Sequence, residues 1–364
     1  MRSWSFFSFL LACAAPLTAQ SPASSTAPHE AAAPHSAYFI AGADVSFLRD
    51  LESKGVVFKD DGKAAPGLEI LRNHGYNWIR LRIMNEPTPL PNTLAYTLAE
   101  AKAAKALGFR LLLDFHYSDD WADPQHETTP KVWAKLPHAD LVKAVFNFSR
   151  DTITTFRQEG VIPDMVQVGN EVTVGMLWPD GKLPDRWEQL GELLTAGVRG
   201  VEAGKGDLPR PAIMIHIDRG GDIENTKWFF DNLILNHVPF DVIGQSYYPW
   251  WQGSLDDLRK NLAFMATRYK KPIIVAETAY DWRDSEDFSG RKREFPETPE
   301  GQRAFLSALV EVVKNTSGGL GKGVFWWEPM AEGPIAKRGL FDDEHNALPA
   351  IRVFDAASSA KSVQ

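Results

Sequence analysis

Two glutamates stand where short apolar runs end, and their side chains are the best candidates for catalysis. Glu171 follows residues 165–169 and comes directly after Asn170, while Glu277 follows residues 272–276. The two lie 277 − 171 = 106 positions apart, so only the fold can bring them together. Two carboxyl groups that flank a glycosidic bond can serve as general acid/base and nucleophile. The pair therefore predicts glycoside hydrolysis, with Asn170 bonding a sugar 2-hydroxyl; either glutamate alone fits a buried ion-pair partner equally well.

Polar and aromatic side chains also mark the ends of the other predicted strands. We expect them to bind substrate, because the carboxyl ends of the strands in a parallel barrel gather at one face. The candidates on and just after the strands are Asp44, Arg80, Arg82, Asp114, His116, Asn170, His216, Tyr247 and Trp327. Tryptophans in the loops can line a saccharide cleft together, although each alone is equally typical of packing. They are Trp121 and Trp178, which we add to the substrate-binding candidates, and Trp250, Trp251 and Trp282.

Other chemistries find less support in the sequence. Glu86 and Glu328 each precede a proline; we expect a loop role for Glu86, and Glu328 is either structural or in contact with substrate. The histidines lack metal-ligand spacing, and the sequence contains no Gly-x-Ser-x-Gly elbow. The acidic residues Asp284, Glu286 and Asp287 are typical of a solvated charge run, with a structural calcium site as the alternative. We predict a reaction that requires no cofactor and no catalytic metal.

Short apolar runs alternate with longer amphipathic segments along the chain. Several runs are almost continuously apolar, as expected for parallel strands buried on both faces. The predicted strands are residues 38–43, 78–83, 110–115, 165–169, 212–216, 242–247, 272–276 and 323–327. The helical patterns between them include residues 93–107, 141–159, 189–203, 255–269 and 299–315. This alternation predicts an α/β fold, a single (β/α)8 TIM barrel that forms the catalytic domain over residues 37–356.

The two ends of the chain differ from its middle. Residues 1–19 predict a secretory signal peptide: Arg2, an apolar stretch too short for a membrane span, and the small residue Ala19. Acylation at Cys13, which would anchor a lipoprotein, is the alternative. Residues 20–36 predict a flexible Ala/Pro/Ser-rich leader, and residues 357–364 a C-terminal tail. We therefore expect a secreted protein, either periplasmic or extracellular.

The composition of the 364 residues is that of a globular chain. Hydrophobic residues make up 44% and charged residues 24%, enough for a large core. The 39 basic and 47 acidic residues give a net charge of 39 − 47 = −8, which disfavours a nucleic-acid partner. Cys13 is the only cysteine, so a chain cleaved after Ala19 has no disulfide and no thiol nucleophile. We expect a monomer whose partner is a polysaccharide substrate.

Seven motifs, in the same order along the chain, resemble glycoside hydrolase family 53. They are GADVS at 42–46, IRLR at 79–82, LDFHYSDDWADP at 113–124, GNE at 169–171, MLWP at 176–179, SYYP at 246–249 and FWWEP at 325–329. The likeness runs from about residue 39 to residue 354, and its longest motif is specific. This family comprises secreted endo-β-1,4-galactanases that cut the galactan side chains of pectin.

The resemblance implies a (β/α)8 barrel with retaining chemistry, in which Glu171 is the acid/base and Glu277 the nucleophile. Retention calls for carboxyl groups about 5–5.5 Å apart, and we expect Glu171 to be the protonated member. Departures at residues 83–87 and 330–332 affect the shape of the subsites, and the calcium-loop pattern of some bacterial members is not matched after Glu277. The alternatives are another retaining barrel endo-glycanase, acting on mannan, xylan or cellulose, and a galactan-binding protein without catalysis.

Overall fold

The computed structural model describes residues 39–355. The predicted signal peptide, leader and C-terminal tail, together with Cys13, lie outside the described residues. Within residues 39–355, no helix has the length and apolar character that crossing a membrane requires.

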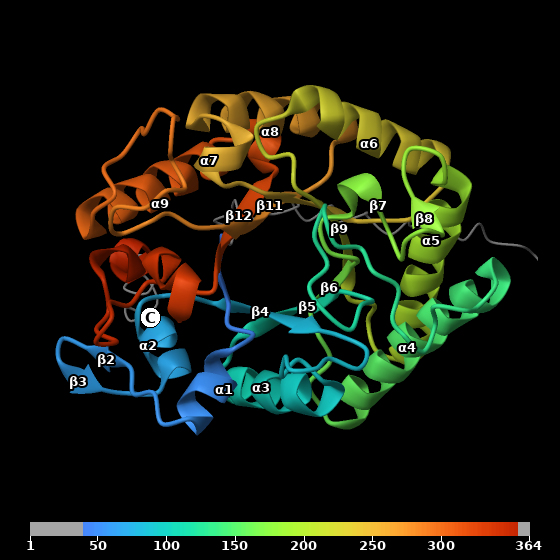
Figure 1. The fold of residues 1–364 in the computed structure, drawn as a ribbon, viewed down its shortest axis with the longest axis horizontal. Helices are drawn as coiled ribbons and strands as arrows, with labels where there is room; N and C mark the ends of the chain where they lie inside the picture. Colours follow the sequence, from blue (N-terminus) through green and yellow to red (C-terminus); the bar gives the residue numbers. More distant parts are fainter. Residues whose placement is uncertain (1–38, 356–364) are drawn as a thin grey trace, which may run out of the picture. The chain divides into compact units, whose positions relative to one another are not determined.

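Eight parallel strands of the described chain close into a barrel, which confirms the predicted single (β/α)8 architecture (Figure 1). Each strand pairs with its neighbours in the chain, and the last pairs with the first. The barrel strands are β1 (Ile40–Asp44), β4 (Trp78–Ile83), β5 (Arg110–Phe115), β6 (Met165–Val168), β9 (Ala212–Ile217), β10 (Val242–Ser246), β11 (Ile273–Thr278) and β12 (Gly321–Trp327). Every boundary lies within two residues of its predicted position.

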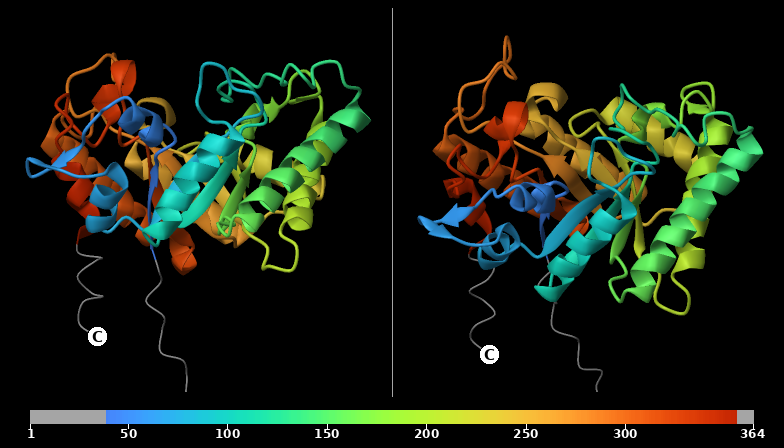
Figure 2. Two further views of the ribbon diagram at one scale, coloured as in Figure 1. Left: turned by 90° about the horizontal axis from the view of Figure 1, so that it is seen from below. Right: turned by 60° about the horizontal axis from the view of Figure 1, so that its bottom comes forward.

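Helices surround the barrel in Figure 1, and Figure 2 shows α4 and α5 running side by side on its outside. The helices are α1 (Leu48–Ser53), α2 (Gly67–Asn73), α3 (Leu94–Ala106), α4 (His138–Gln158), α5 (Trp187–Gly204), α6 (Ile223–Leu235), α7 (Pro249–Gln252), α8 (Leu255–Tyr269) and α9 (Pro299–Lys314). Thr93, Ser254 and Thr298 start three of them, because each side chain accepts a hydrogen bond from a backbone N–H of the first turn.

Short elements lie in the connections. They are the hairpins β2 (Lys59–Asp60) with β3 (Lys63–Ala64) and β7 (Gly175–Met176) with β8 (Gly181–Lys182), and the 3-10 helices η1 (Val172–Val174), η2 (Ser317–Gly319), η3 (Gly333–Arg338) and η4 (Pro349–Phe354). The apolar pattern does not predict them, since two to six residues are too few to show a period.

Alternate residues of each strand point into the barrel. One set of inward side chains forms an apolar cluster: Ile40, Trp78, Leu112, Met165, Met214, Val242, Ile274, Ala276 and Phe325. Toward the C-terminal ends of the strands, residues on the same face are polar; Asp44, Arg80 and Asp114 among them are completely buried. The barrel therefore carries a buried polar layer on an apolar base.

Candidate active site

The polar layer follows from strand alternation. Counting in twos from the apolar cluster leads to Asp44 on β1, Arg80 and Arg82 on β4, Asp114 on β5, Gln167 on β6, His216 on β9 and Ser246 on β10. All of these side chains are buried, and most contact a neighbour from the adjoining strand. The strands, rather than the loops, therefore fix the floor of the site.

Glu171 follows β6 in a left-handed backbone conformation, with φ = 46°. Gly169 before it has φ = 82°, and a Cβ there would lie 2.6 Å from Val172 Cγ1, so this turn requires glycine. A positive φ at a non-glycine residue costs about 1–3 kcal/mol and is concentrated at functional sites. The turn directs the carboxyl group across the barrel, where Oε1 accepts a hydrogen bond from Ser246 Oγ at 2.5 Å.

A β-bulge brings Glu277 into the site. Ala276 belongs to the inward apolar cluster, so regular alternation would turn Glu277 outward. The pairing of β10 with β11 shifts at this point: Gln245 pairs with Val275, but the next residue, Ser246, pairs with Glu277. A bulge of this kind re-aims a side chain beside an active site. Both Ala276 and Glu277 are consequently buried at the barrel interior.

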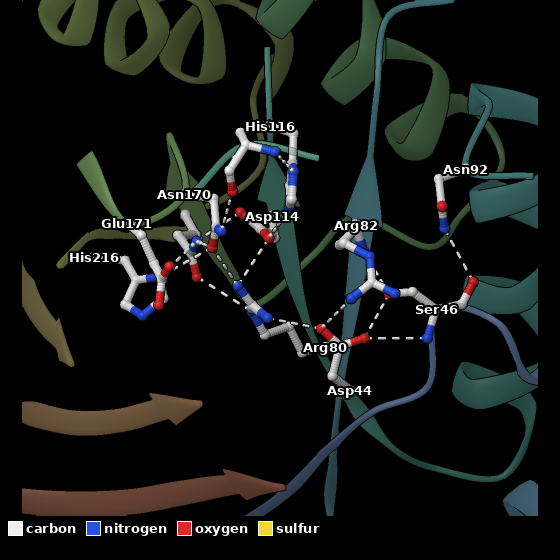
Figure 3. Close-up of polar contacts among 12 residues, drawn as sticks. Asp44, Ser46, Arg80, Arg82, Asn92, Asp114, His116, Asn170, Glu171 and His216 are labelled. Atoms are coloured by element: carbon white, nitrogen blue, oxygen red, sulfur yellow. Dashed lines mark hydrogen bonds and ion pairs between the residues drawn. The ribbon is translucent and has the colours of Figure 1, made fainter. Parts of the chain in front are cut away.

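Arg80 ties the polar layer together (Figure 3). Burial alone would lower the pKa of its guanidinium, but the carboxylates of Asp114 and Glu277 outweigh burial and raise it, so the group stays charged. Its contacts are Asp44 Oδ2 at 2.7 Å, Glu277 Oε1, Asp114 Oδ2 and Asn170 Oδ1 at 2.8 Å each, and Gln167 Oε1 at 3.2 Å.

The two glutamates have different electrostatic surroundings. Burial raises the pKa of Glu171 well above its usual value, and the negative charges of Glu277 and Asp218 raise it further. Burial also raises the pKa of Glu277, but the Arg80 guanidinium at 2.8 Å opposes that rise. Within the pair, Glu171 is therefore suited to carry a proton, and Glu277 is suited to be ionised.

Both glutamates line one hollow of about 340 Å³. Three indole side chains, Trp121, Trp251 and Trp327, form part of its wall. The ring centroids of Trp121 and Trp327 lie 6.3 Å apart. Rigid aromatic faces of this kind offer contact area to the C–H face of a sugar ring at little cost in conformational entropy.

Arg82 lines the same hollow and is fixed by ion pairs. Its Nη2 donates to Glu328 Oε1, and its Cζ lies 4.7 Å from the ring centroid of Trp121. Its Nη1 lies 3.5 Å from Asp44 Oδ2, within ion-pair distance.

A second hollow, of about 430 Å³, adjoins the first at Glu171. Asp123, Glu171 and Trp251 line both, and the Trp251 side chain is 59% exposed between them. The second hollow is lined by Asp218, whereas Glu277 lines only the first. Glu171 therefore stands between two hollows and shares only one of them with Glu277.

Tyr247 does not reach either hollow, and its prediction as a substrate-binding residue needs correction. Its hydroxyl donates to the carbonyl oxygen of Gly253 at 3.0 Å, and its ring stacks on Phe305 outside the barrel. The next residue, Tyr248, lines the hollow and donates to Glu277 Oε2 at 3.1 Å. Tyr248 lies two residues after Ser246, so counting in twos one step past the end of β10 reaches the tyrosine that lines the hollow.

The other predicted substrate-binding residues fall into three groups. Those that line the hollow with the two glutamates are Arg82, His116, Trp121, Asn170 and Trp327. Those that lie in the buried layer are Asp44, Arg80, Asp114 and His216. Trp178 lines neither hollow; it is half-buried, with Lys182 Nζ 4.1 Å from its ring centroid. The predicted substrate-binding residues do not include Gln167 and Ser246, which lie on inward strand positions, or Tyr248 and Arg338, which line the hollow.

The other acidic residues considered in the sequence lie outside the pair formed by Glu171 and Glu277. Glu86 is exposed, and Glu328 is buried in its ion pair. Within residues 39–355, no three His, Cys, Asp or Glu side chains are grouped so as to hold a metal ion. In the acidic loop, Asp287 contacts Lys337 at 3.1 Å and Arg338 at 2.6 Å.

A pair of buried carboxyl groups at the C-terminal face of a (β/α)8 barrel, in a hollow walled by tryptophans, defines a barrel glycoside hydrolase. Comparison with known proteins supports this class. The family model described as Glycosyl hydrolase family 53 matches residues 40–354, nearly all of the described chain. The chain belongs to glycoside hydrolase family 53, as its motifs predict.

Similar proteins cover most of the chain. The arabinogalactan endo-β-1,4-galactanase of Cellvibrio japonicus is 33% identical over 353 residues, covering 89% of this chain and 92% of the relative. The enzyme of the same name from Humicola insolens is 33% identical over 86% of this chain and 98% of its own. A solved GH53 catalytic domain from Ignisphaera aggregans has a TM-score of 0.80 at 34% identity, covering 87% of this chain and 95% of that one.

Proposed function

We propose that this glycoside hydrolase is an endo-β-1,4-galactanase with a retaining, double-displacement mechanism. Glu277 attacks the anomeric carbon while Glu171 protonates the glycosidic oxygen, and Glu171 then deprotonates the water that releases the sugar. The asymmetry of the pair is the main support: the Arg80 guanidinium lies 2.8 Å from Glu277, whereas Glu171 is buried against the neutral hydroxyl of Ser246. The first step needs one ionised and one protonated carboxyl group.

The two adjoining hollows support endo action. The acid must reach the oxygen that joins two sugars, so the bond to be cut lies at Glu171. The sugar attacked by Glu277 then occupies the first hollow, and the departing chain occupies the second, which contains Asp218 and Arg219. Trp251 lines both hollows, and we propose that it supports the chain across the cleavage point.

The names of the relatives support β-1,4-galactan as the substrate, because both curated relatives described above are called arabinogalactan endo-β-1,4-galactanases. The hollow suits a neutral polysaccharide, because indole side chains form part of its wall. The net charge of −8 disfavours a polyanion.

We also propose that the protein is secreted and acts as a monomer. A polysaccharide too large to enter the cell must be cut outside the cytoplasmic membrane, in the periplasm or beyond the cell. The predicted signal peptide at residues 1–19 supports export, with lipid attachment at Cys13 as the alternative.

A polysaccharide panel tests the substrate. We expect the purified chain without its signal peptide to release short oligosaccharides from linear β-1,4-galactan and to leave β-1,4-mannan, xylan and cellulose intact. Hydrolysis of another glycan in preference to galactan would make this a different barrel glycanase. Binding of galactan without turnover would make it a binding protein.

The stereochemistry of the first product tests the mechanism. If the two carboxyl groups lie about 5–5.5 Å apart, no water fits between the nucleophile and the anomeric carbon. We therefore expect proton NMR during the first minutes of galactan hydrolysis to show the β anomer, with the α anomer appearing later by mutarotation. An α anomer at the earliest time point would establish inversion and overturn the assignment of Glu277 as nucleophile.

A further inference from the structure

Ser246 lies between the proposed acid/base and a buried histidine. Its Oγ donates to Glu171 Oε1 at 2.5 Å and lies 2.9 Å from His216 Nε2. Ser246 and His216 have no exposed surface. Neither residue reacts in the proposed mechanism, and neither lines the hollow that contains both glutamates, here called the sugar hollow.

The proton on His216 determines which way this chain of hydrogen bonds runs. Burial, with the charge of Arg80, lowers the pKa of His216 well below its usual value, so the ring is neutral and carries one proton. The Ser246 hydroxyl has a single proton, which it donates to Glu171. Its contact with His216 then requires Nε2–H to be the donor and Ser246 Oγ the acceptor.

The far side of the ring supports this tautomer. His216 Nδ1 lies 3.1 Å from Gln167 Nε2, a donor, and 3.1 Å from Asn170 Oδ1. That Asn170 oxygen accepts from Arg80 Nη2 at 2.8 Å. The two protons of Gln167 Nε2 face Asp114 Oδ1 at 2.6 Å and Asn170 Oδ1 at 3.0 Å as well as His216 Nδ1. Gln167 cannot turn its amide around, because its Oε1 accepts from Arg80 Nε at 3.2 Å. An unprotonated Nδ1 is able to accept from the Gln167 amide, in keeping with the tautomer that the contact with Ser246 requires.

We propose that Ser246, oriented by His216, is the positioning residue of Glu171: it holds Oε1 and leaves the other carboxyl oxygen to exchange the proton with the glycosidic oxygen. This proposal rests on the proposed function, in which Glu171 is the acid/base. A donor fixed at Oε1 defines the plane of the carboxyl group. It also stabilises the carboxylate that Glu171 becomes after it has delivered its proton.

Ser246 also opposes the groups that hold the proton on Glu171. Burial raises the pKa of Glu171, as do Glu277, Asp218 and Asp123; Ser246 lowers it. The buried Glu127 and Tyr248 also interact electrostatically with Glu171. Because Ser246 favours the ionised form, its removal should raise the pKa of Glu171 and move the alkaline limb of kcat/KM to higher pH.

Substrates with different leaving groups test the proposal. A dinitrophenolate leaves without protonation, whereas a methoxide or a sugar needs the acid. We expect Ser246→Ala to lower kcat/KM about tenfold or more on methyl β-galactobioside and on galactan, within the range of acid catalysis. Its kcat/KM on dinitrophenyl β-galactobioside should change little. Ser246→Thr, which keeps the hydroxyl, should restore most of the loss.

The outcomes are distinct. An equal loss on both leaving groups with an unshifted pH profile would make Ser246 merely structural, and an active Ser246→Ala enzyme with unchanged profiles would also overturn the proposal. Nitrogen-15 NMR of His216 gives a readout that needs no substrate: we expect the neutral Nε2–H tautomer, and the Nδ1–H tautomer would overturn the proposed direction of donation. If galactan is not the substrate, the tautomer of His216 still tests the hydrogen bonds from His216 through Ser246 to Glu171. Failure of the proposed function and failure of this proposal are therefore separable.

Discussion

Arg80 and Ser246 give the two glutamates different environments. A guanidinium 2.8 Å from Glu277 favours its carboxylate form. At Glu171, burial and nearby negative charges raise the pKa, and the neutral hydroxyl of Ser246 opposes that rise. Both supporting residues belong to barrel strands, β4 and β10. The proposed division between acid and nucleophile therefore depends on side chains of the barrel strands rather than on the loops that surround the hollow.

Glutamine substitutions test these roles. Glu171→Gln and Glu277→Gln keep the size of each side chain, but remove the transferable proton or the nucleophilic anion. We expect Glu171→Gln to lower kcat on galactan by about 10²-fold or more, and Glu277→Gln to lower it by several orders of magnitude. Initial rates with purified variants measure both losses. Glu86→Gln, an exposed carboxyl outside the hollow, is the matched control and should retain wild-type activity.

Azide distinguishes one glutamate from the other. In Glu277→Ala, azide can occupy the space of the nucleophile and attack an activated glycoside directly, which gives the inverted α-glycosyl azide. In Glu171→Ala, azide instead attacks the glycosyl-enzyme and gives the retained β-glycosyl azide. The opposite pairing of products would exchange the two assignments, and substantial turnover of either glutamine variant without azide would refute its role.

At the scale of elements, apolar runs predict the strands well, because a strand buried on both faces must be apolar for most of its length. The same runs do not reveal the bulge that turns Glu277 inward, since a bulge depends on the pairing of β10 with β11. The left-handed conformation of Glu171 is likewise a property of the turn after β6. The sequence therefore predicts the two glutamates that the barrel brings into one hollow, but not the backbone features that direct their side chains.

The alternation of inward and outward side chains along a strand is the most useful sequence signal for the residues of the site. Counting in twos along β10 leads to Ser246 and, one step past the end of the strand, to Tyr248. Tyr247, the last residue of the predicted strand, lies on the opposite face and packs outside. Trp178 shows the limit of this signal. It lies in a loop, where no alternation fixes its direction, and the structure places it apart from both hollows.

The seam between β1 and β12 gives a prediction about packing. A Cβ on Gly42 would lie 2.2 Å from Cδ1 of Phe325, whose ring is buried in the apolar cluster below the polar layer. We expect Gly42→Ala to lower the free energy of unfolding by about 1–3 kcal/mol through overpacking. Thermal unfolding followed by circular dichroism should show the corresponding fall in Tm.

A double variant identifies the cause. Phe325→Leu removes the ring that the new methyl group would strike, so Gly42→Ala should cost less stability in the Phe325→Leu background than in the wild type. An equal cost in both backgrounds, or no fall in Tm for the single variant, would show that contact with Phe325 is not what requires glycine.

At the scale of the whole molecule, contacts between successive loops shape the rim of the cleft. Arg338, in η3 after β12, contacts Asp287 in the loop after β11 at 2.6 Å. Its guanidinium also lies 4.8 Å from the ring of Trp250 and 5.5 Å from the ring of Trp251, both on α7. One cation thus connects the loops that follow three neighbouring barrel strands, and it does so at the wall of the sugar hollow.

These contacts lead to a prediction about metal dependence. We expect both galactan turnover and Tm to survive exhaustive EDTA treatment followed by removal of the chelator. In the proposed mechanism, Glu171 protonates the leaving oxygen, so no Lewis acid is needed. In the acidic loop, Lys337 at 3.1 Å and Arg338 at 2.6 Å already balance the charge of Asp287. Loss of turnover at an unchanged Tm, restored by Ca²⁺, would contradict the mechanism. A fall in Tm that Ca²⁺ reverses would instead place a structural ion beside Asp284 and Asp287, where we expect lysine and arginine side chains to balance the negative charge.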